Sequence, residues 1–174
     1  KFAGLTPIVC ANLPYNITTP AITALIESKC VESITVLVQK EVAERLCAAP
    51  GTSAYGAFSV FMQYYTEPEY LFAVPRGCFE PQPKVTSAVL RAVVRREPPV
   101  EVEDEKFFFR VVYAAFALRR KTLVNSLMTA FGSQLTKEQV TQAVTSCGLE
   151  ANIRGERLGL SEFAALSAEI AALL

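Results

Sequence analysis

The proline pair in Glu97-Pro98-Pro99 separates two patterns in this chain of 174 residues and constrains its fold more than any other feature. Before it, short runs of β-branched and aromatic residues alternate with segments whose apolar residues recur at helical spacing. After it, only helical spacing continues. Such alternation is typical of strand-helix-strand units in a mainly parallel sheet. We therefore expect part of an α/β domain over residues 1–97 and a small all-helical domain over residues 98–174.

The first part should contain four strands and three helices. We expect the strands at residues 6–11, 33–39, 69–74 and 86–95. Helices should lie near residues 20–26, 42–47 and 58–65, the first of them capped by Thr18-Thr19. Residues 78–84 contain Pro81 and Pro83, which favour neither a helix nor a central strand, so this segment should be a stiff, extended loop.

The second part should contain four helices. Asp104 and Glu105 are suited to a helix N-terminus, and Thr136 with Gln139 matches a capping box. A further helix should end at Gly132, and Ser161 should cap the last one.

Composition excludes several classes of protein. The chain has no histidine, which removes histidine bases, Ser-His-Asp sites and nearly all catalytic zinc sites, and no metal site is expected. No apolar run approaches the ~18 residues of a membrane helix, and residues 1–11 do not resemble a signal peptide. The five cysteines show no C-x-x-C spacing, so we expect reduced core thiols in a cytoplasmic protein.

Basic residues are clustered although the net charge is zero. Neither residues 81–96 nor residues 106–137 contain an acidic residue. Such runs are often only solvated faces, but two of them in a small chain favour a polyanionic partner. The candidate phosphate-binding residues are Lys84, Arg91, Arg95, Arg119, Arg120 and Lys121.

The tetrapeptide Asn12-Leu13-Pro14-Tyr15 follows the first expected strand. Ligands of open α/β sheets bind at the carboxyl ends of the strands. An exocyclic amine of a nucleobase is a poor nucleophile, and the amide oxygen of Asn12 and the carbonyl of Pro14 could accept hydrogen bonds from it. The ring of Tyr15 could stack on the base. The alternative is a plain turn in which Asn12 caps, Pro14 stiffens and Tyr15 packs.

Four motifs in order resemble the small-subunit ribosomal RNA adenine dimethyltransferase family. They are residues 12–20 (NLPYNITTP), 38–45 (VQKEVAER), 79–89 (FEPQPKVTSAV) and 119–127 (RRKTLVNSL). The resemblance spans most of the chain and implies a Rossmann-like methyltransferase domain with an antiparallel last strand, followed by a helical RNA-binding domain. It also implies dimethylation of two adjacent adenines near the 3′ end of small-subunit RNA, with S-adenosylmethionine as the methyl donor.

The resemblance assigns roles to individual residues. Asn12 and Pro14 would hold the target amine, Tyr15 and Phe79 would sandwich the flipped adenine, and Asn12 and Leu13 would touch the donor. The family's glycine-rich donor-binding turn is not seen, so we expect a fragment that is inactive alone. The first strand would then be an exposed edge through which chains could pair.

The sequence leaves two other functions open. One is a non-catalytic RNA-binding or ribosome-assembly module, which would need no amine acceptors at Asn12 and Pro14. The other is an erythromycin-resistance type enzyme that methylates large-subunit RNA, although residues 79–89 and 119–121 resemble the small-subunit enzymes more.

Overall fold

The computed structural model describes residues 4–174. Contacts divide the chain into two units, and each is described by itself. Unit 1 comprises Lys1–Cys47 and Met62–Pro98, and unit 2 comprises Ala48–Phe61 and Pro99–Leu174. The expected division between residues 97 and 98 places residues 48–61 with the first part, whereas by contacts this segment groups with the helical part.

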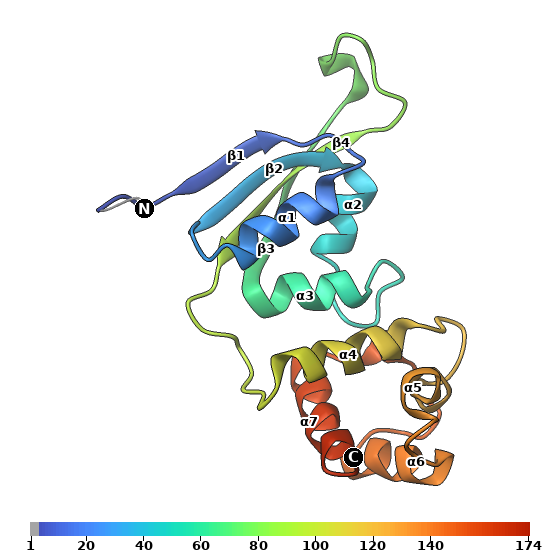
Figure 1. Cartoon of the computed structure of the whole chain (residues 1–174). Helices are drawn as coiled ribbons and strands as arrows, with labels where there is room; N and C mark the ends of the chain where they lie inside the picture. The colour runs from blue at the N-terminus through green and yellow to red at the C-terminus, as the bar shows by residue number, and fades with distance from the viewer. Residues whose placement is uncertain (1–3) are drawn as a thin grey trace. The chain divides into compact units, whose positions relative to one another are not determined.

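Unit 1 is built on a four-stranded mixed sheet of order β1-β2-β4-β3 (Figure 1). The strands are β1 (Ile8–Asn12), β2 (Ser33–Gln39), β3 (Thr66–Val74) and β4 (Ser87–Val94). Of the paired strands only β1 and β2 are parallel, because β4 runs antiparallel to both of its neighbours. Strands β1, β2 and β3 therefore run in one direction and β4 in the other. The described sheet is mixed: three of its four strands share one direction, as a mainly parallel sheet requires, and β4 is the antiparallel last strand that the resemblance implied.

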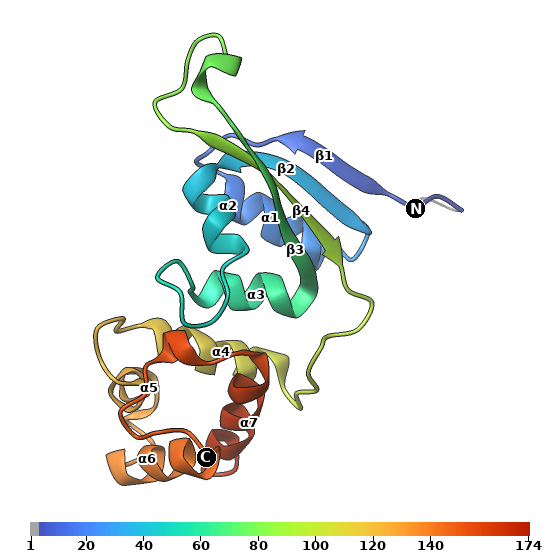
Figure 2. The ribbon, with the colours of Figure 1, turned by 180° about the vertical axis from the view of Figure 1, so that it is seen from behind.

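Two helices of unit 1 pack on the sheet. They are α1 (Thr18–Glu27) and α2 (Lys40–Leu46). Along β2, Ile34, Val36 and Val38 are buried while the residues between them are half-buried, so one face of the strand carries the core. In Figure 2, seen from behind, β3 and β4 pass in front of α1.

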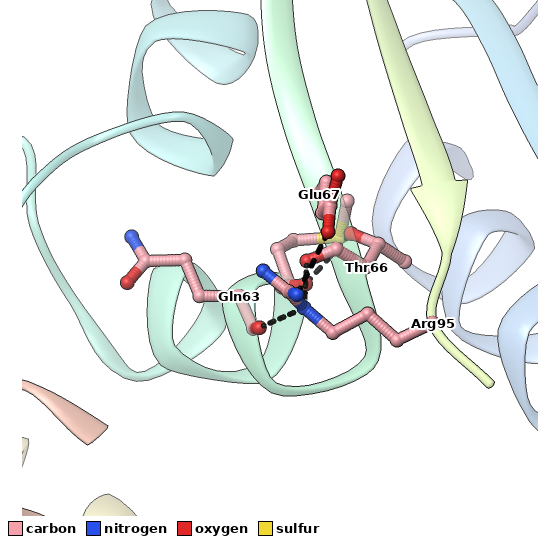
Figure 3. A network of polar contacts seen from close by, with 5 residues as sticks. Gln63, Thr66, Glu67 and Arg95 are labelled. Carbon is pink, nitrogen blue, oxygen red and sulfur yellow. Dashed lines mark hydrogen bonds and ion pairs between the residues drawn. The ribbon is translucent and has the colours of Figure 1, made fainter. Parts of the chain in front are cut away.

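Helix α3 (Ala57–Tyr65) runs directly into β3, and Arg95 braces the junction (Figure 3). Its Nε donates to the backbone carbonyls of Gln63 and Thr66 at 3.2 and 3.1 Å. Its Nη1 pairs with the Glu67 carboxylate at 2.9 Å. The junction places Pro68 in an edge strand, where a missing N–H is tolerated.

Unit 2 contains four complete helices after Pro99: α4 (Glu105–Phe116), α5 (Leu123–Phe131), α6 (Lys137–Ser146) and α7 (Leu160–Ala171). Their buried side chains include Phe108, Leu127, Phe131 and Phe163. A short 3-10 turn, η2 (Gly155–Arg157), precedes α7. No helix within the described residues is long and apolar enough to cross a membrane.

The expected helix beginnings were confirmed in part. Asp104 caps α4, and Thr136 with Gln139 forms the capping box of α6. Two expectations were wrong. Thr18 is the first residue of α1 and makes no cap bond, and α7 is preceded by Gly159, whose N–H donates to Glu162, so Ser161 is not its cap.

The cysteines also differ from expectation. All five are free, but Cys10, Cys30 and Cys78 are exposed, so they are not core thiols. Cys10 lies on edge strand β1, whose alternate residues are exposed, and Cys78 lies in the loop after β3.

Candidate base-binding site

The tetrapeptide Asn12–Tyr15 lies at the carboxyl end of β1, as its position in the sequence suggested. Asn12 is the last residue of β1 and pairs with Leu37 of β2. The N–H of Leu13 donates to the carbonyl of Leu37 at 3.2 Å, which fixes the start of the tetrapeptide to the sheet. The chain then turns at Pro14 and Tyr15 before α1 begins.

The second part of the site comes from the loop between β3 and β4. At the end of the sheet where Asn12 lies, the register aligns Leu37, Val89 and Phe72, so this loop emerges beside the tetrapeptide. Figures 1 and 2 show the loop extending beyond that end. It begins with a 3-10 turn, η1 (Arg76–Cys78), which overlaps the expected loop at Cys78, and residues 79–86 form neither helix nor strand.

The two segments line one surface pocket of about 290 Å³. Its lining residues are Asn12, Leu13, Pro14, Tyr15, Phe79, Pro81 and Pro83. The lining carries no charged side chain, offers amide and carbonyl oxygens, and has two aromatic rings. A neutral, flat ligand with N–H donors, such as a nucleobase, matches this lining.

The Pro14 carbonyl is engaged within the chain. It accepts hydrogen bonds from the Ile17 N–H at 3.1 Å and from the Thr18 hydroxyl at 3.3 Å. Both donors lie within four residues of Pro14 along the chain. Because the carbonyl oxygen already accepts two hydrogen bonds, a ligand amine would have to displace one of these donors or share the oxygen with it.

The hydroxyl of Tyr15 lies 2.9 Å from that of Ser87, the first residue of β4. Tyr15 is 37% exposed, while Ser87 is fully buried. The bond therefore joins the rim of the pocket to the interior of the sheet. Sequence reasoning missed Ser87, because nothing local distinguishes this serine from the rest of its strand.

The loop carrying Phe79 is tied across its base by Arg76. The guanidinium of Arg76 donates to the carbonyl of Lys84 at 3.3 Å, and the N–H of Lys40 donates to the carbonyl of Thr86 at 2.9 Å. Arg76 and Lys84 are both exposed, so two cations flank the neutral pocket on the same loop. Arg76 was also missed, since the basic run was counted only from residue 81.

The remaining basic candidates lie in different surroundings. Arg91 is exposed on β4, opposite Thr35 and Glu69, whereas three contacts engage the guanidinium of Arg95. Arg119, Arg120 and Lys121 lie in the turn between α4 and α5 of unit 2, where Arg119 donates to the carbonyl of Ser53. Lys84, Arg91 and Arg95 thus belong to unit 1 and the other three to unit 2.

No metal centre accompanies this site. Within residues 4–174, no group of three or more cysteine and acidic side chains is close enough to hold a metal ion.

The sequence of the chain is similar to those of known proteins. Residues 6–170 match the family described as "Ribosomal RNA adenine dimethylase". A protein named "Ribosomal RNA small subunit methyltransferase A" from Geobacillus sp. (strain WCH70) is 49% identical over 170 residues, which is 96% of this chain and 58% of that protein. A protein of the same name from Bacillus mycoides (strain KBAB4) is 49% identical over 166 residues, which is 94% of this chain and 57% of that protein. The chain thus spans somewhat over half the length of these relatives.

Two solved structures share the fold. A dimethyladenosine transferase from Plasmodium falciparum matches with a TM-score of 0.79 and 21% identity, over 99% of this chain and 70% of the other. The 23S rRNA methyltransferase ErmE matches with a TM-score of 0.68 and 22% identity, over 98% of this chain and 70% of the other.

Proposed function

Because the chain belongs to the ribosomal RNA adenine dimethylase family, we propose that it forms the base-binding part of an RNA adenine N6-dimethyltransferase. Its substrate would be two adjacent adenines near the 3′ end of small-subunit ribosomal RNA. The observation that carries this proposal is the uncharged pocket in which Asn12–Tyr15 and Phe79 meet, although more than sixty residues separate them along the chain. The cytoplasm of a bacterium is the proposed setting, since the relatives above are bacterial.

The fold supports the same assignment. We propose that the sheet of unit 1 is the C-terminal half of a Rossmann-like methyltransferase domain, with β4 as its antiparallel last strand. The helices after Pro99 would form a separate RNA-binding domain. The matched solved structures resemble this chain in fold at low sequence identity, so they support the architecture and carry no residue roles.

Adenine N6 needs help to react, because its lone pair is delocalised into the ring. Bound S-adenosylmethionine supplies an electrophilic methyl group on a sulfonium. The amide oxygen of Asn12 would accept a hydrogen bond from N6–H and orient the remaining lone pair toward that methyl group. The alkylated amine is acidic and releases a proton, so no histidine base is required.

The Pro14 carbonyl would accept the second N6–H bond. Of its two present donors, the Ile17 N–H is fixed by the backbone, whereas the Thr18 hydroxyl can rotate about its side chain. We propose that the target amine takes the place of the Thr18 hydroxyl. The rings of Tyr15 and Phe79 would hold the flipped base from its two faces, where stacking contributes about 1–3 kcal/mol per base.

The described pocket fits the base better than the complete donor. Its volume of about 290 Å³ lies at the lower end of small-molecule sites. No acidic side chain lines it to bind a ribose. We propose that Asn12 and Leu13 contact only the reacting end of the donor, and that the rest is held by the part of the longer relatives that this chain does not match.

Phosphate contacts would come from both units. We propose Lys84 and Arg91 in unit 1 and Arg119, Arg120 and Lys121 in unit 2 as residues that neutralise RNA phosphates. Arg95 is the weakest of the predicted set, because its guanidinium already braces α3 and β3.

The test uses an extended protein, made by joining upstream of this chain the unmatched segment of the Geobacillus sp. (strain WCH70) relative. Purified small and large ribosomal subunits lacking adenine methylation are incubated with it and labelled S-adenosylmethionine. We expect label in small-subunit RNA alone, as N6,N6-dimethyladenosine. Label confined to the large subunit would favour the erythromycin-resistance type, and RNA binding without methyl transfer would favour the non-catalytic module.

A further inference from the structure

Ser87 occupies a rigid position in the sheet. As the first residue of β4 it pairs with Gln39 of β2 and with Val74 of β3. The carbonyl of Thr86, the residue before it, accepts a hydrogen bond from Lys40 at 2.9 Å. Its side chain is fully buried. A strand residue with partners on both sides has little freedom to move, so its hydroxyl is a fixed point.

Tyr15 has far fewer restraints of its own. It lies in the turn between β1 and α1, and more than a third of it is exposed. Its phenol hydroxyl is at the far end of the ring from the backbone. A hydrogen bond at that end, 2.9 Å from Ser87, fixes where the far end of the ring lies and so restrains rotation about the Cα–Cβ bond of the side chain.

The same serine also closes the loop that carries Phe79. The loop leaves β3 after Val74 and rejoins the sheet at Ser87, which pairs with Val74 across its base. Ser87 is therefore tied through its backbone to the segment with Phe79 and through its side chain to Tyr15. Among the pocket's neighbours, this residue alone connects the two segments by a described side-chain hydrogen bond.

We infer that Ser87 is a positioning residue for methyl transfer, whose hydroxyl holds the Tyr15 ring at the place that the stacked target base requires. The inference rests on the proposed function and adds to it a residue that is outside the pocket and touches no substrate. Ser87 restrains the Tyr15 side chain before the base binds, so less conformational entropy of this side chain is lost on binding.

The restraint itself can be tested on this chain without RNA. In a sample labelled with ¹³C in the tyrosine rings, the Tyr15 signal is assigned with Tyr15→Phe. We expect Ser87→Ala to move this signal toward the position of a freely rotating tyrosine and leave the other tyrosine signals in place. Ser167→Ala is the matched control, since it removes another buried serine hydroxyl, bonded to the Ala164 carbonyl in α7. An unmoved Tyr15 signal in Ser87→Ala would overturn the inference.

The role in catalysis is tested on the extended protein. Loss of one positioning hydrogen bond should lower kcat about tenfold in Ser87→Ala. The KM for RNA should change less than about twofold, because phosphate contacts dominate affinity. Tyr15→Phe removes the other half of the bond, so the double variant should be no slower than the slower single variant.

The results distinguish a failure of the proposed function from a failure of the role of Ser87 alone. If the unaltered extended protein transfers no methyl group, the proposed function and this role fall together. If it is active and Ser87→Ala keeps its full kcat, or if the two single losses multiply, the inference alone is overturned.

Discussion

The Thr18 hydroxyl competes, in the proposed mechanism, with the target amine for the Pro14 carbonyl. Thr18→Val keeps the shape of this buried side chain and removes the donor at 3.3 Å. We expect methyl transfer by the extended protein to be retained or to rise by a few fold, because one lone pair of Pro14 is freed. Single-turnover transfer measures this, and a loss of tenfold or more in a folded variant would mean that the hydroxyl supports the reaction.

Replacing Arg95 or Arg120 should change the free energy of unfolding by different amounts. Arg95→Ala should destabilise the fold by about 1–3 kcal/mol, because it removes hydrogen bonds from a charged group. Arg120 is exposed and makes no hydrogen bond or ion pair with the described residues, so Arg120→Ala should cost less than about 0.5 kcal/mol. Urea denaturation measures both.

In RNA binding, Arg120→Ala should have the larger effect of the two variants, although it has the smaller effect on stability. Arg120→Ala should lower the slope of log affinity against log salt by about one, whereas Arg95→Ala should leave it unchanged. Equal slopes for Arg120→Ala and the unaltered chain would remove Arg120 from the RNA surface. A reduced slope for Arg95→Ala would restore Arg95 to it.

Cys47 follows α2, and its thiol should be alkylated more slowly than those of Cys10 and Cys78. Burial, and then the Glu69 carboxylate, raise its pKa from 9.0 to about 11. The reactive thiolate therefore appears two pH units later, and at pH 8 its fraction at Cys47 is about a hundredfold lower than the unshifted pKa of 9.0 would give, so alkylation of Cys47 should be slow. Mass spectrometry after brief iodoacetamide treatment should find Cys10 and Cys78 labelled first. The Cys47 rate should rise up to about pH 11, and a plateau near pH 9 would contradict the assignment.

At the scale of elements, Gly155 fixes the contact between η2 and α4. A Cβ at this position would lie 2.6 Å from the carbonyl oxygen of Ala115, which is backbone and cannot move easily. We expect Gly155→Ala to destabilise the chain by about 1–3 kcal/mol. Gly56→Ala is the control, since a Cβ there meets no atom within 4 Å. Thermal unfolding of the two variants should differ, and equal midpoints would show that η2 shifts to accommodate the methyl group.

The sequence predicted which elements form better than where they begin. Strand β2 was expected at 33–39 and is observed at Ser33–Gln39, because a run of β-branched side chains lies between a turn on one side and the start of α2 on the other. Strand β3 begins three residues earlier than expected, at Thr66. Its early residues include Pro68 and two glutamates, which are poor strand formers, and pairing with β4 outweighs that preference.

Strand direction was not readable from local pattern. The alternation of strands and helices favours parallel pairing, yet β4 follows β3 through a loop that returns the chain antiparallel. The Asp104 cap and the capping box at Thr136 were readable, because each depends on residues within one turn. The Ser161 cap failed since Glu162 reaches back to the Gly159 N–H and the helix starts two residues earlier than a cap at Ser161 would allow.

At the scale of the molecule, the pocket depends on contacts that no local pattern reports. Asn12–Tyr15 and Phe79 could be named separately from their residue types and their resemblance to a family. Their meeting in one pocket depends on β2 and β4 lying between β1 and β3 in the sheet. The Tyr15–Ser87 bond and the grouping of residues 48–61 with the helical unit are likewise long-range features.

Methyl transfer and RNA affinity, measured together for Tyr15→Ala and Phe79→Ala in the extended protein, test the central claim most directly. The account predicts that dimethyladenosine formation falls at least a hundredfold, since the target base loses one wall of its pocket. RNA affinity should weaken by no more than about 150-fold, which corresponds to the ~1–3 kcal/mol that one stack contributes, because phosphate contacts supply the rest of the affinity. If either variant instead lost RNA binding but kept its rate per bound complex, the pocket would be an RNA-anchoring surface and not the site of methyl transfer.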